Sequence, residues 1–249
     1  MTRMDAAGLS ATEIQIPTPN AAIPGYCARP DGDAKYPVIL VIQEIFGVNA
    51  HMKDVCRRLA KLGYMAIAPE LYARQGDVSK MTDIQEIIAK VISKVADSQV
   101  NSDLDAAVAW AESEGHGDTT RLGIVGFCWG GRAAWLYAAH SDRLKAGGAF
   151  YGQLVGAVNE YRTRTALDAA ADLKAPVIGF YGGADHGIPM EQVHQMQQAL
   201  RDAAKDSMIL VYPDAPHAFF ADYRPSYREA DAKDAWGHLI AWFAKHGVA

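Results

Sequence analysis

The sequence predicts an α/β fold in which a mostly parallel central sheet carries helices on both faces. Short runs rich in Val, Ile, Tyr and Phe alternate along the chain with longer stretches whose apolar residues recur at helical spacing. That alternation is typical of parallel strands joined by crossover helices. Half of the 249 residues are hydrophobic and 21% are charged, which suits one sizeable core. We therefore expect a single domain over residues 1–249.

The expected strands are runs of β-branched and aromatic residues bounded by turn residues. Two weaker runs come first, at residues 13–17 and 23–28, and should pair as an antiparallel hairpin. The stronger runs follow and should form the parallel part of the sheet: residues 36–42, 64–69, 122–127, 146–151, 177–181 and 208–212.

Amphipathic stretches between these runs predict the helices. The last of them carries Trp236, Leu239 and Phe243 at helical spacing, which is more typical of core packing than of a cofactor site. Residues 152–174 follow no regular pattern and are expected to form a loop or a cap near the site. The expected helices are residues 50–62, 83–96, 102–114, 132–140, 190–204 and 227–246.

Charge and composition favour a small-molecule ligand. A net charge of -5 leaves no basic surface for nucleic acid or for an anionic membrane. The chain shows no signal-peptide pattern and no apolar run of membrane-spanning length, and its three cysteines suit a reducing compartment, so we expect a cytoplasmic protein. We expect no metal and no cofactor, because the required His, Cys or Gly spacings are missing. The sequence indicates no oligomeric state.

The candidate nucleophile is Cys128. The strand at residues 122–127 runs into a glycine-framed turn, and a helical pattern follows, which is the order that a nucleophile elbow requires. The N-terminus of a helix also favours a thiolate. The alternative is a buried structural cysteine, the role that we expect for Cys27 and Cys56, which lie in a strand-like run and a helix-like stretch. The turn has the sequence Gly126-Phe127-Cys128-Trp129-Gly130-Gly131.

The partners of the nucleophile are expected in loops that follow later strands. In the α/β-hydrolase fold the nucleophile, the acid and the histidine come in that order along the chain. Asp185 follows the strand at residues 177–181 and His217 follows the strand at 208–212, so we expect Asp185 to orient His217 as the base. The alternatives are Asp214 as the acid, His186 as the base, and a helix N-cap role for Asp185.

The strand at residues 36–42 predicts the oxyanion hole. In hydrolases of this fold one backbone amide comes from the loop after this strand and another from the residue after the nucleophile. We therefore expect the amides of Ile45 and Trp129 to serve. Glu44 lies at the end of the same strand, where a carboxylate is costly unless it is paired or used. Glu44 is expected to face the site, and a salt bridge to Arg or Lys is the alternative.

Together these residues resemble the dienelactone hydrolase family, also called carboxymethylenebutenolidases, from about residue 23 to residue 243. The resemblance implies a Cys128, Asp185 and His217 triad that opens an ester or lactone through a thioester, and a Glu44 that contacts the resting thiol. The matching segments are Gln43-Glu44-Ile45-Phe46-Gly47-Val48-Asn49, Pro69-Glu70-Leu71-Tyr72-Ala73-Arg74, the elbow, Phe150-Tyr151-Gly152, and the loops of Asp185 and His217.

The sequence departs from the family at the residues that hold the substrate carboxylate. The family uses two arginines there, but residues 75–120 contain none and residues 218–221 contain none. This argues against dienelactone as the natural substrate, and we expect Arg224 or the hydroxyls of Tyr72, Tyr151 and Tyr223 to orient the substrate. Rival functions are another acyl hydrolase, such as a thioesterase or cysteine peptidase, and a non-catalytic protein that binds a ligand or senses oxidants through Cys128.

Overall fold

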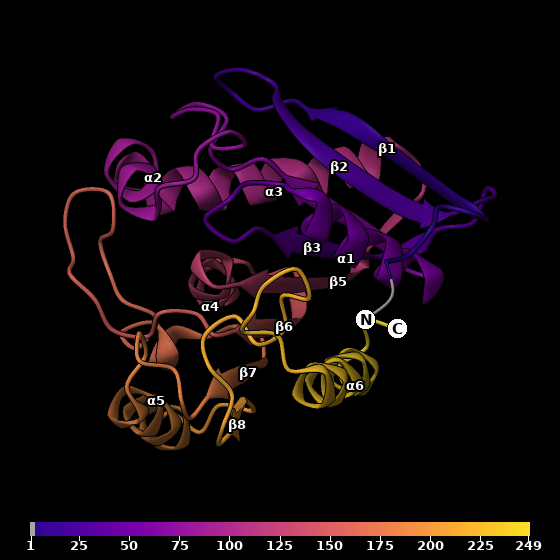
Figure 1. The fold of residues 1–249 in the computed structure, drawn as a ribbon. Helices are drawn as coiled ribbons and strands as arrows, with labels where there is room; N and C mark the ends of the chain where they lie inside the picture. Colours follow the sequence, from indigo (N-terminus) through magenta and orange to yellow (C-terminus); the bar gives the residue numbers. More distant parts are fainter. Residues whose placement is uncertain (1–2) are drawn as a thin grey trace.

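The computed structural model describes residues 3–249 and contains one sheet of eight strands (Figure 1). The strand order is β1-β2-β4-β3-β5-β6-β7-β8. The pairs β1–β2 and β2–β4 are antiparallel, while all pairs from β4–β3 to β7–β8 are parallel, so the expected hairpin and parallel sheet are confirmed. The strands are β1 (Leu9–Ile16), β2 (Ile23–Pro30), β3 (Tyr36–Ile42), β4 (Met65–Pro69), β5 (Gly117–Phe127), β6 (Leu144–Phe150), β7 (Val177–Gly182) and β8 (Met208–Tyr212).

Helices cover both faces of the sheet. A Cβ atom added to Gly123 of β5 would meet Phe243 of α6 at 3.3 Å, whereas one added to Gly126 would meet Gly130 of α4 at 1.9 Å. Side chains three residues apart on a strand point to opposite faces, so α4 and α6 lie on opposite sides. The helices are α1 (Ala50–Lys61), α2 (Ile84–Lys90), α3 (Asp97–Ser113), α4 (Trp129–His140), α5 (Met190–Asp202) and α6 (Glu229–Lys245).

The single helix expected at residues 83–96 is wrong. Helix α2 ends at Lys90, a 3₁₀ turn η1 (Ile92–Lys94) follows, and α3 begins at Asp97. The backbone leaves the helical region at Val91, with φ -120° and ψ -67°. Val91 and Ile92 are both buried. We attribute the end of α2 at this point to the burial of these β-branched side chains, which are moderate helix formers. The helical spacing of apolar residues in the sequence does not report this burial.

The carboxyl ends of five parallel strands meet at one edge of the sheet. Register pairs such as Ile42 with Gly126 and Phe127 with Phe150 place the ends of β3, β5 and β6 side by side. The ends of β7 and β8 continue the row. Because ligands of open α/β sheets bind outside these ends, the loops that follow them form the candidate site.

Stacked aromatic rings form the floor under this edge. Phe150 of β6 stacks on Phe127 at 4.9 Å between ring centroids and on Phe180 at 4.4 Å. Phe220, from the loop after β8, stacks on Phe127 at 5.2 Å. All four rings are fully buried. Offset ring stacking of this kind restricts the strand ends and the β8–α6 loop to one arrangement.

Arg132 of α4 joins the start of α3 and the irregular segment at residues 152–174 to the helix after the elbow. Arg132 of α4 donates to both oxygens of Asp97, at 2.6 and 2.9 Å, and to the carbonyl oxygen of Arg164 at 2.7 Å. Apart from the 3₁₀ turn η2 (Ala170–Asp172), the described residues of that segment form no helix or strand, as expected. Arg132 therefore stabilises the segment against α3 and α4.

We expect Asp97→Ala to lower the free energy of unfolding by about 3 kcal/mol, because it leaves the Arg132 charge buried without its partner. Urea unfolding followed by circular dichroism measures the change. The control is Lys233→Ala, which removes an exposed ion pair with Glu229 and should leave the midpoint unchanged. An equal effect of the two substitutions would contradict the assignment.

Candidate active site

Cys128 lies in a strained turn between β5 and α4. Its φ of 53° and ψ of -113° lie in a region that residues with a side chain seldom adopt, and its amide donates to the carbonyl oxygen of Phe150 at 3.0 Å. A Cβ atom on Gly126 would lie 1.9 Å from the carbonyl oxygen of Gly130, and one on Gly130 would lie 2.5 Å from that of Gln43. Only glycine fits at both positions.

The structure brings Cys128, His217 and Asp185 together. Nε2 of His217 lies 3.2 Å from Sγ of Cys128, and Nδ1 lies 2.7 Å from Oδ2 of Asp185. The other oxygen of Asp185 accepts from the amide of Gly187 at 2.8 Å. Both oxygens of this buried carboxylate are thus bonded. The arrangement can take a proton from the thiol and hold the imidazole in one orientation.

The charge on His217 is favoured by its two neighbours. Burial disfavours the imidazolium, but hydrogen bonds and charge interactions with Asp185 and Cys128 outweigh it and raise the pKa of His217 to about 10. The alternatives Asp214 and His186 are both exposed, and the N-cap of α5 is Pro189 rather than Asp185. The carboxylate bonded to His217 is that of Asp185.

The other two cysteines, Cys27 and Cys56, differ from Cys128 in how deeply their thiols are buried. Both thiols are buried. Burial raises the pKa of Cys27 to about 12 and that of Cys56 well above its ordinary value. A buried thiol that resists ionisation packs as a small apolar side chain, which agrees with the structural role expected for these two residues.

The two residues expected beside the oxyanion lie on different elements: Ile45 is in the loop after β3, and Trp129 is the first residue of α4. The amides of Ile45 and Trp129 donate to no backbone acceptor within residues 3–249. The rings of Tyr72 and Trp129 meet at 4.9 Å, and the Tyr72 hydroxyl donates to the carbonyl oxygen of Glu44 at 3.4 Å. Tyr72 therefore links the two peptide segments that carry the free amides.

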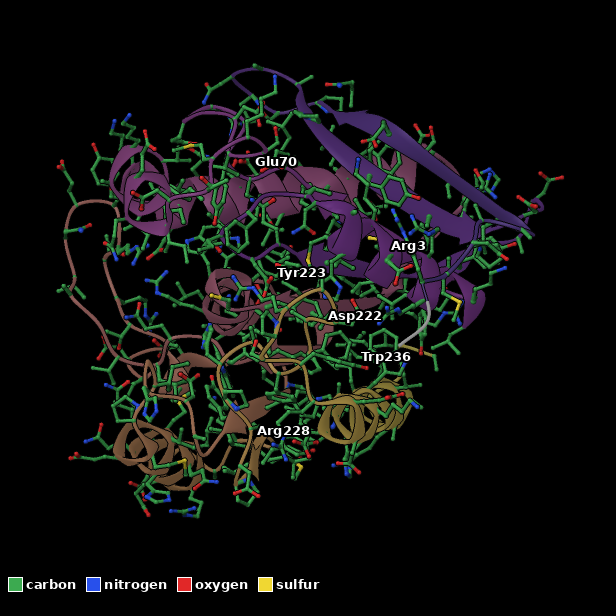
Figure 2. The ribbon with its side chains drawn as sticks, viewed as in Figure 1. Arg3, Glu70, Asp222, Tyr223, Arg228 and Trp236 are labelled. Carbon is green, nitrogen blue, oxygen red and sulfur yellow. The ribbon has the colours of Figure 1, made fainter. Side chains whose placement is uncertain are left out.

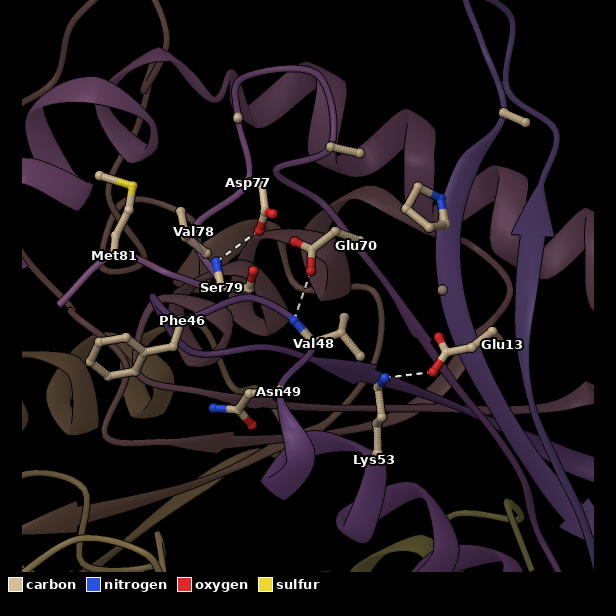
Figure 3. A pocket seen from close by; sticks show the side chains of 15 residues that line it. Glu13, Phe46, Val48, Asn49, Lys53, Glu70, Asp77, Val78, Ser79 and Met81 are labelled. Carbon is tan, nitrogen blue, oxygen red and sulfur yellow. Dashed lines mark hydrogen bonds and ion pairs between the residues drawn. The ribbon is translucent and has the colours of Figure 1, made fainter.

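Glu70 holds the loop after β3 through hydrogen bonds, a role that the sequence did not predict. Its carboxylate accepts from the amide of Val48 at 2.8 Å and from Nε2 of Gln43 at 2.9 Å. Figure 3 shows the bond to Val48 at the edge of a cavity of about 710 Å³. Phe46 and Val48 line this cavity, but Cys128 and His217 do not. The sequence offered two signals, the place of Glu70 directly after β4 and its position in a segment that matches the family, but neither indicated this contact.

Glu44 is buried at the end of β3 and forms no ion pair within residues 3–249. It is 1% exposed, and its Oε2 accepts a hydrogen bond of 2.6 Å from the hydroxyl of Tyr223. Its Oε1 has no hydrogen-bond partner among the residues that the structure describes. The alternative of a salt bridge to Arg or Lys is therefore not what pairs Glu44 here. The carboxylate faces a phenol from the β8–α6 loop.

Tyr151 offers an unused hydroxyl at the site. Its ring meets that of His217 at 5.1 Å, and its backbone has a positive φ of 37°. The residue is fully buried, and its hydroxyl has no partner in the described part of the chain. Burial and the charges of Glu44 and Cys128 raise the pKa of Tyr151 well above its ordinary value. The phenol therefore remains a hydrogen-bond donor.

Two partly buried arginines flank the site. The guanidinium of Arg224 lies 5.0 Å from the centroid of the Phe46 ring, a cation–π contact. The guanidinium of Arg162 forms no ion pair or hydrogen bond with residues 3–249, and it lies close enough to Asp97 and Tyr72 for its charge to interact with them. Burial and the nearby charge of Arg132 lower the pKa of Arg162. Sequence reasoning missed Arg162, because it lies in the irregular segment.

Residues that could gather around a metal ion are not found in the described chain. No group of three or more His, Cys, Asp or Glu side chains in residues 3–249 has the required arrangement. Within the same residues no helix is long and apolar enough to span a membrane.

Comparison with known proteins identifies the family. The model of the dienelactone hydrolase family matches residues 23–247. The chain belongs to the dienelactone hydrolase family. It is 59% identical over 245 residues to a Methylorubrum extorquens protein named "Putative carboxymethylenebutenolidase", covering 98% of this chain and 84% of that protein. A Yersinia pestis protein of the same name is 52% identical over 243 residues, covering 97% and 91%.

A solved structure agrees with this assignment. The crystal structure named for a "Putative Dienelactone Hydrolase" from Klebsiella pneumoniae aligns with a TM-score of 0.93 and 50% identity, covering 95% of this chain and 99% of that one. The α/β-hydrolase fold expected from the sequence is therefore confirmed, and so is the resemblance to dienelactone hydrolases. As a member of this family the protein is a hydrolase.

We expect Glu70→Ala to lower kcat at least tenfold, because the loop that carries Ile45 loses two side-chain hydrogen bonds. Steady-state kinetics on a reactive ester measures the change. Glu13→Ala is the matched control, since the exposed Glu13 lines the same cavity and its carboxylate pairs with the partly buried Lys53. A normal kcat in Glu70→Ala would contradict the role of this carboxylate.

Proposed function

We propose that the protein hydrolyses a carboxylic ester or lactone, with Cys128 as nucleophile, His217 as base and Asp185 as the group that orients the base. The observation that carries this proposal is the unbroken chain of contacts from Sγ of Cys128 through His217 to Asp185, at 3.2 and 2.7 Å. These distances lie within the reach that nucleophilic catalysis requires. Membership of the dienelactone hydrolase family supports the same chemistry.

In the first half-reaction Sγ of Cys128 gives its proton to Nε2 of His217 and attacks the acyl carbon. The carbonyl oxygen gains negative charge, which the amides of Ile45 and Trp129 stabilise. The bond to the leaving oxygen then breaks, and that oxygen, an enolate oxygen in the case of an enol lactone, takes the proton from Nε2 of His217, which leaves the imidazole neutral for the next step. The product of this step is a thioester on Cys128.

In the second half-reaction water attacks the thioester. His217 takes a proton from the water, the bond between the acyl carbon and Sγ breaks, and the thiolate returns to its place beside the imidazolium. Asp185 stays ionised and stabilises the charged imidazole throughout, as an acid in a triad does. The product is a free carboxylic acid, which is an open-chain acid when the substrate is a lactone.

The surroundings of the nucleophile favour a substrate that carries a negative charge. Arg162 and Arg224 form no ion pair with a carboxylate among the described side chains, although Asp97 is near enough to act on the pKa of Arg162. Arg162 also lies near Tyr72, and Arg224 lies near Tyr151 and Tyr223. Burying an arginine without an anion is costly. The neutral phenols of Tyr72, Tyr151 and Tyr223 can add hydrogen bonds to the substrate oxygens.

We expect wild type to release product from a panel of aryl esters and lactones at neutral pH, and Cys128→Ala to release none above background. Product release is followed by absorbance, and the acyl-enzyme is trapped by acid quenching and weighed by mass spectrometry. Cys27→Ala is the control, because Cys27 is buried in β2 away from the elbow. Equal turnover by Cys128→Ala would contradict the mechanism.

One outcome of the same ester and lactone assay would favour the non-catalytic alternative. If wild type hydrolyses no member of the panel while Cys128 still reacts with iodoacetamide or hydrogen peroxide, the weight moves to a protein that binds a ligand or senses oxidants through this thiol.

We expect Arg162→Ala and Arg224→Ala each to raise KM about tenfold for esters with a carboxylate and to leave KM for neutral esters of the same size unchanged. The reason is that only the charged substrates lose an ionic contact. Arg121→Ala serves as the control, because Arg121 lies in β5 away from the carboxyl end of that strand, where the candidate site is. An equal loss on charged and neutral esters would count against an anionic substrate.

A further inference from the structure

The cavity of about 710 Å³ that Phe46 and Val48 line has no role in the proposed triad, and we call it the Phe46 cavity. It lies between the start of β2, the loop after β3 and the loop after β4. Pockets of roughly 300 to 1,000 Å³ are the size that small-molecule ligands occupy. The Phe46 cavity is therefore large enough for a ligand or for part of one.

The charged side chains that line the Phe46 cavity all bond to groups of the chain itself. Nζ of Lys53 bonds to the Glu13 carboxylate at 2.5 Å, and the carboxylates of Glu70 and Asp77 each accept from a backbone amide at 2.8 Å. Figure 3 shows these three bonds. Lys53 is the one cation among the described lining residues, so an anionic ligand finds no unpaired positive charge there and meets three carboxylates.

Apolar side chains form most of the remaining wall, with Phe46, Val48, Val78 and Met81 as the largest. Val78 is buried, and a Cβ atom added to Gly47 would lie 3.2 Å from its side chain, so the two loops pack closely at this point. An apolar surface of this kind stabilises a ligand in proportion to the apolar area that binding removes from water. The wall therefore suits an uncharged alkyl chain or ring.

Phe46 belongs to both the cavity and the catalytic site. It follows Ile45, whose amide is proposed to bind the oxyanion, and consecutive Cα atoms lie about 3.8 Å apart. The Phe46 ring also lies 5.0 Å from the guanidinium of Arg224. Figure 2 labels Glu70, which lines the cavity, and Tyr223, which precedes Arg224 on the β8–α6 loop. A chain that extends from a carbonyl group held by Ile45 therefore reaches the cavity across Phe46 within a few methylene groups.

We propose that the Phe46 cavity binds an uncharged, apolar arm of the substrate while the ester or lactone carbonyl lies at Cys128. The substrate class is then an ester or lactone that carries an alkyl chain or a ring beyond the reacting bond. This inference rests on the proposed function, in which Cys128 is the nucleophile. A carboxylate at Arg162 or Arg224 and an arm in the cavity belong to different parts of the substrate, because the cavity has no unpaired cation.

The test compares chain lengths in wild type and in Ala73→Trp. Ala73 is exposed at the cavity wall, so a larger ring there fills part of the cavity without replacing a buried side chain. One series contains nitrophenyl esters of straight-chain acids from acetate to hexanoate, and the other contains acetate esters of straight-chain alcohols from ethanol to hexanol. We expect kcat/KM of wild type to rise about fourfold for each methylene group added in the series whose chain enters the cavity.

In Ala73→Trp we expect the ratio of kcat/KM for the longest ester to that for the shortest to fall about tenfold or more. Ala34→Trp is the matched control, because Ala34 is also exposed and lies before β3, at the opposite end of that strand from Phe46. It should keep the ratio of wild type. Thermal unfolding reports whether each variant folds.

Binding without turnover is measured on Cys128→Ala by titration calorimetry with the longest ester of each series. We expect the ester whose chain enters the cavity to bind with a negative heat-capacity change, which marks the burial of apolar surface. Adding Ala73→Trp to Cys128→Ala should weaken this binding, and adding Ala34→Trp should not.

Two results would overturn the inference: a wild type whose kcat/KM does not depend on chain length in either series, or a dependence that Ala73→Trp leaves intact, which would place the arm elsewhere. The proposed function fails separately. If the longest ester binds Cys128→Ala as expected while wild type hydrolyses no ester, the hydrolase reaction is refuted and the cavity keeps its ligand.

Discussion

The close approach of β3, β5 and the first turn of α4 is the constraint on which the site depends. Gly126 and Gly130 have no room for a side chain, since the nearest carbonyl oxygens would lie 1.9 and 2.5 Å from an added Cβ. This contact forces Cys128 into its strained backbone conformation and leaves the amide of Trp129 free at the start of α4. It also presses the end of β3, and with it Glu44 and Ile45, against the elbow.

Charges around the elbow are arranged by how deeply they are buried. The negative groups of the interior are matched by donors: Asp185 by His217 and Gly187, and Glu44 by Tyr223. The positive groups Arg162 and Arg224 lie nearer the solvent, and their guanidinium groups have no hydrogen-bond acceptor or ion-pair partner within the described residues. Because unpaired charge costs less where water reaches it, the protein can keep these arginines available for a ligand at a modest cost in stability.

The sequence predicted those features that depend on residues close together in the chain, such as the strands and the loops that follow them. The meeting of Cys128, Asp185 and His217 could be predicted because each follows a strand whose hydrophobic run is clear in the sequence, and parallel strands end at a common edge. The contact between Glu44 and Tyr223 joins residues 179 positions apart, and no periodicity reports such a contact. Arg162 was missed for a similar reason, since its position depends on packing of an irregular segment. The break at Val91 follows from burial, which the helical pattern alone does not reveal.

The β8–α6 loop carries both His217, the proposed base, and Tyr223, which bonds to the Glu44 carboxylate. His217 and Tyr223 lie six residues apart between β8 and α6, and three backbone bonds hold the turn that separates them, among them that of Arg228 to the carbonyl oxygen of Phe219. Ala218, directly after the base, has a positive φ of 60°, so this turn is strained as well as bonded. A shift of the loop would move the imidazole away from the thiol and the phenol away from Glu44 together. The orientation of His217 and the hydrogen bond from Tyr223 to Glu44 are therefore coupled through the backbone, and the bonds of Asp222 to Arg58 and His51 stabilise the loop in this arrangement.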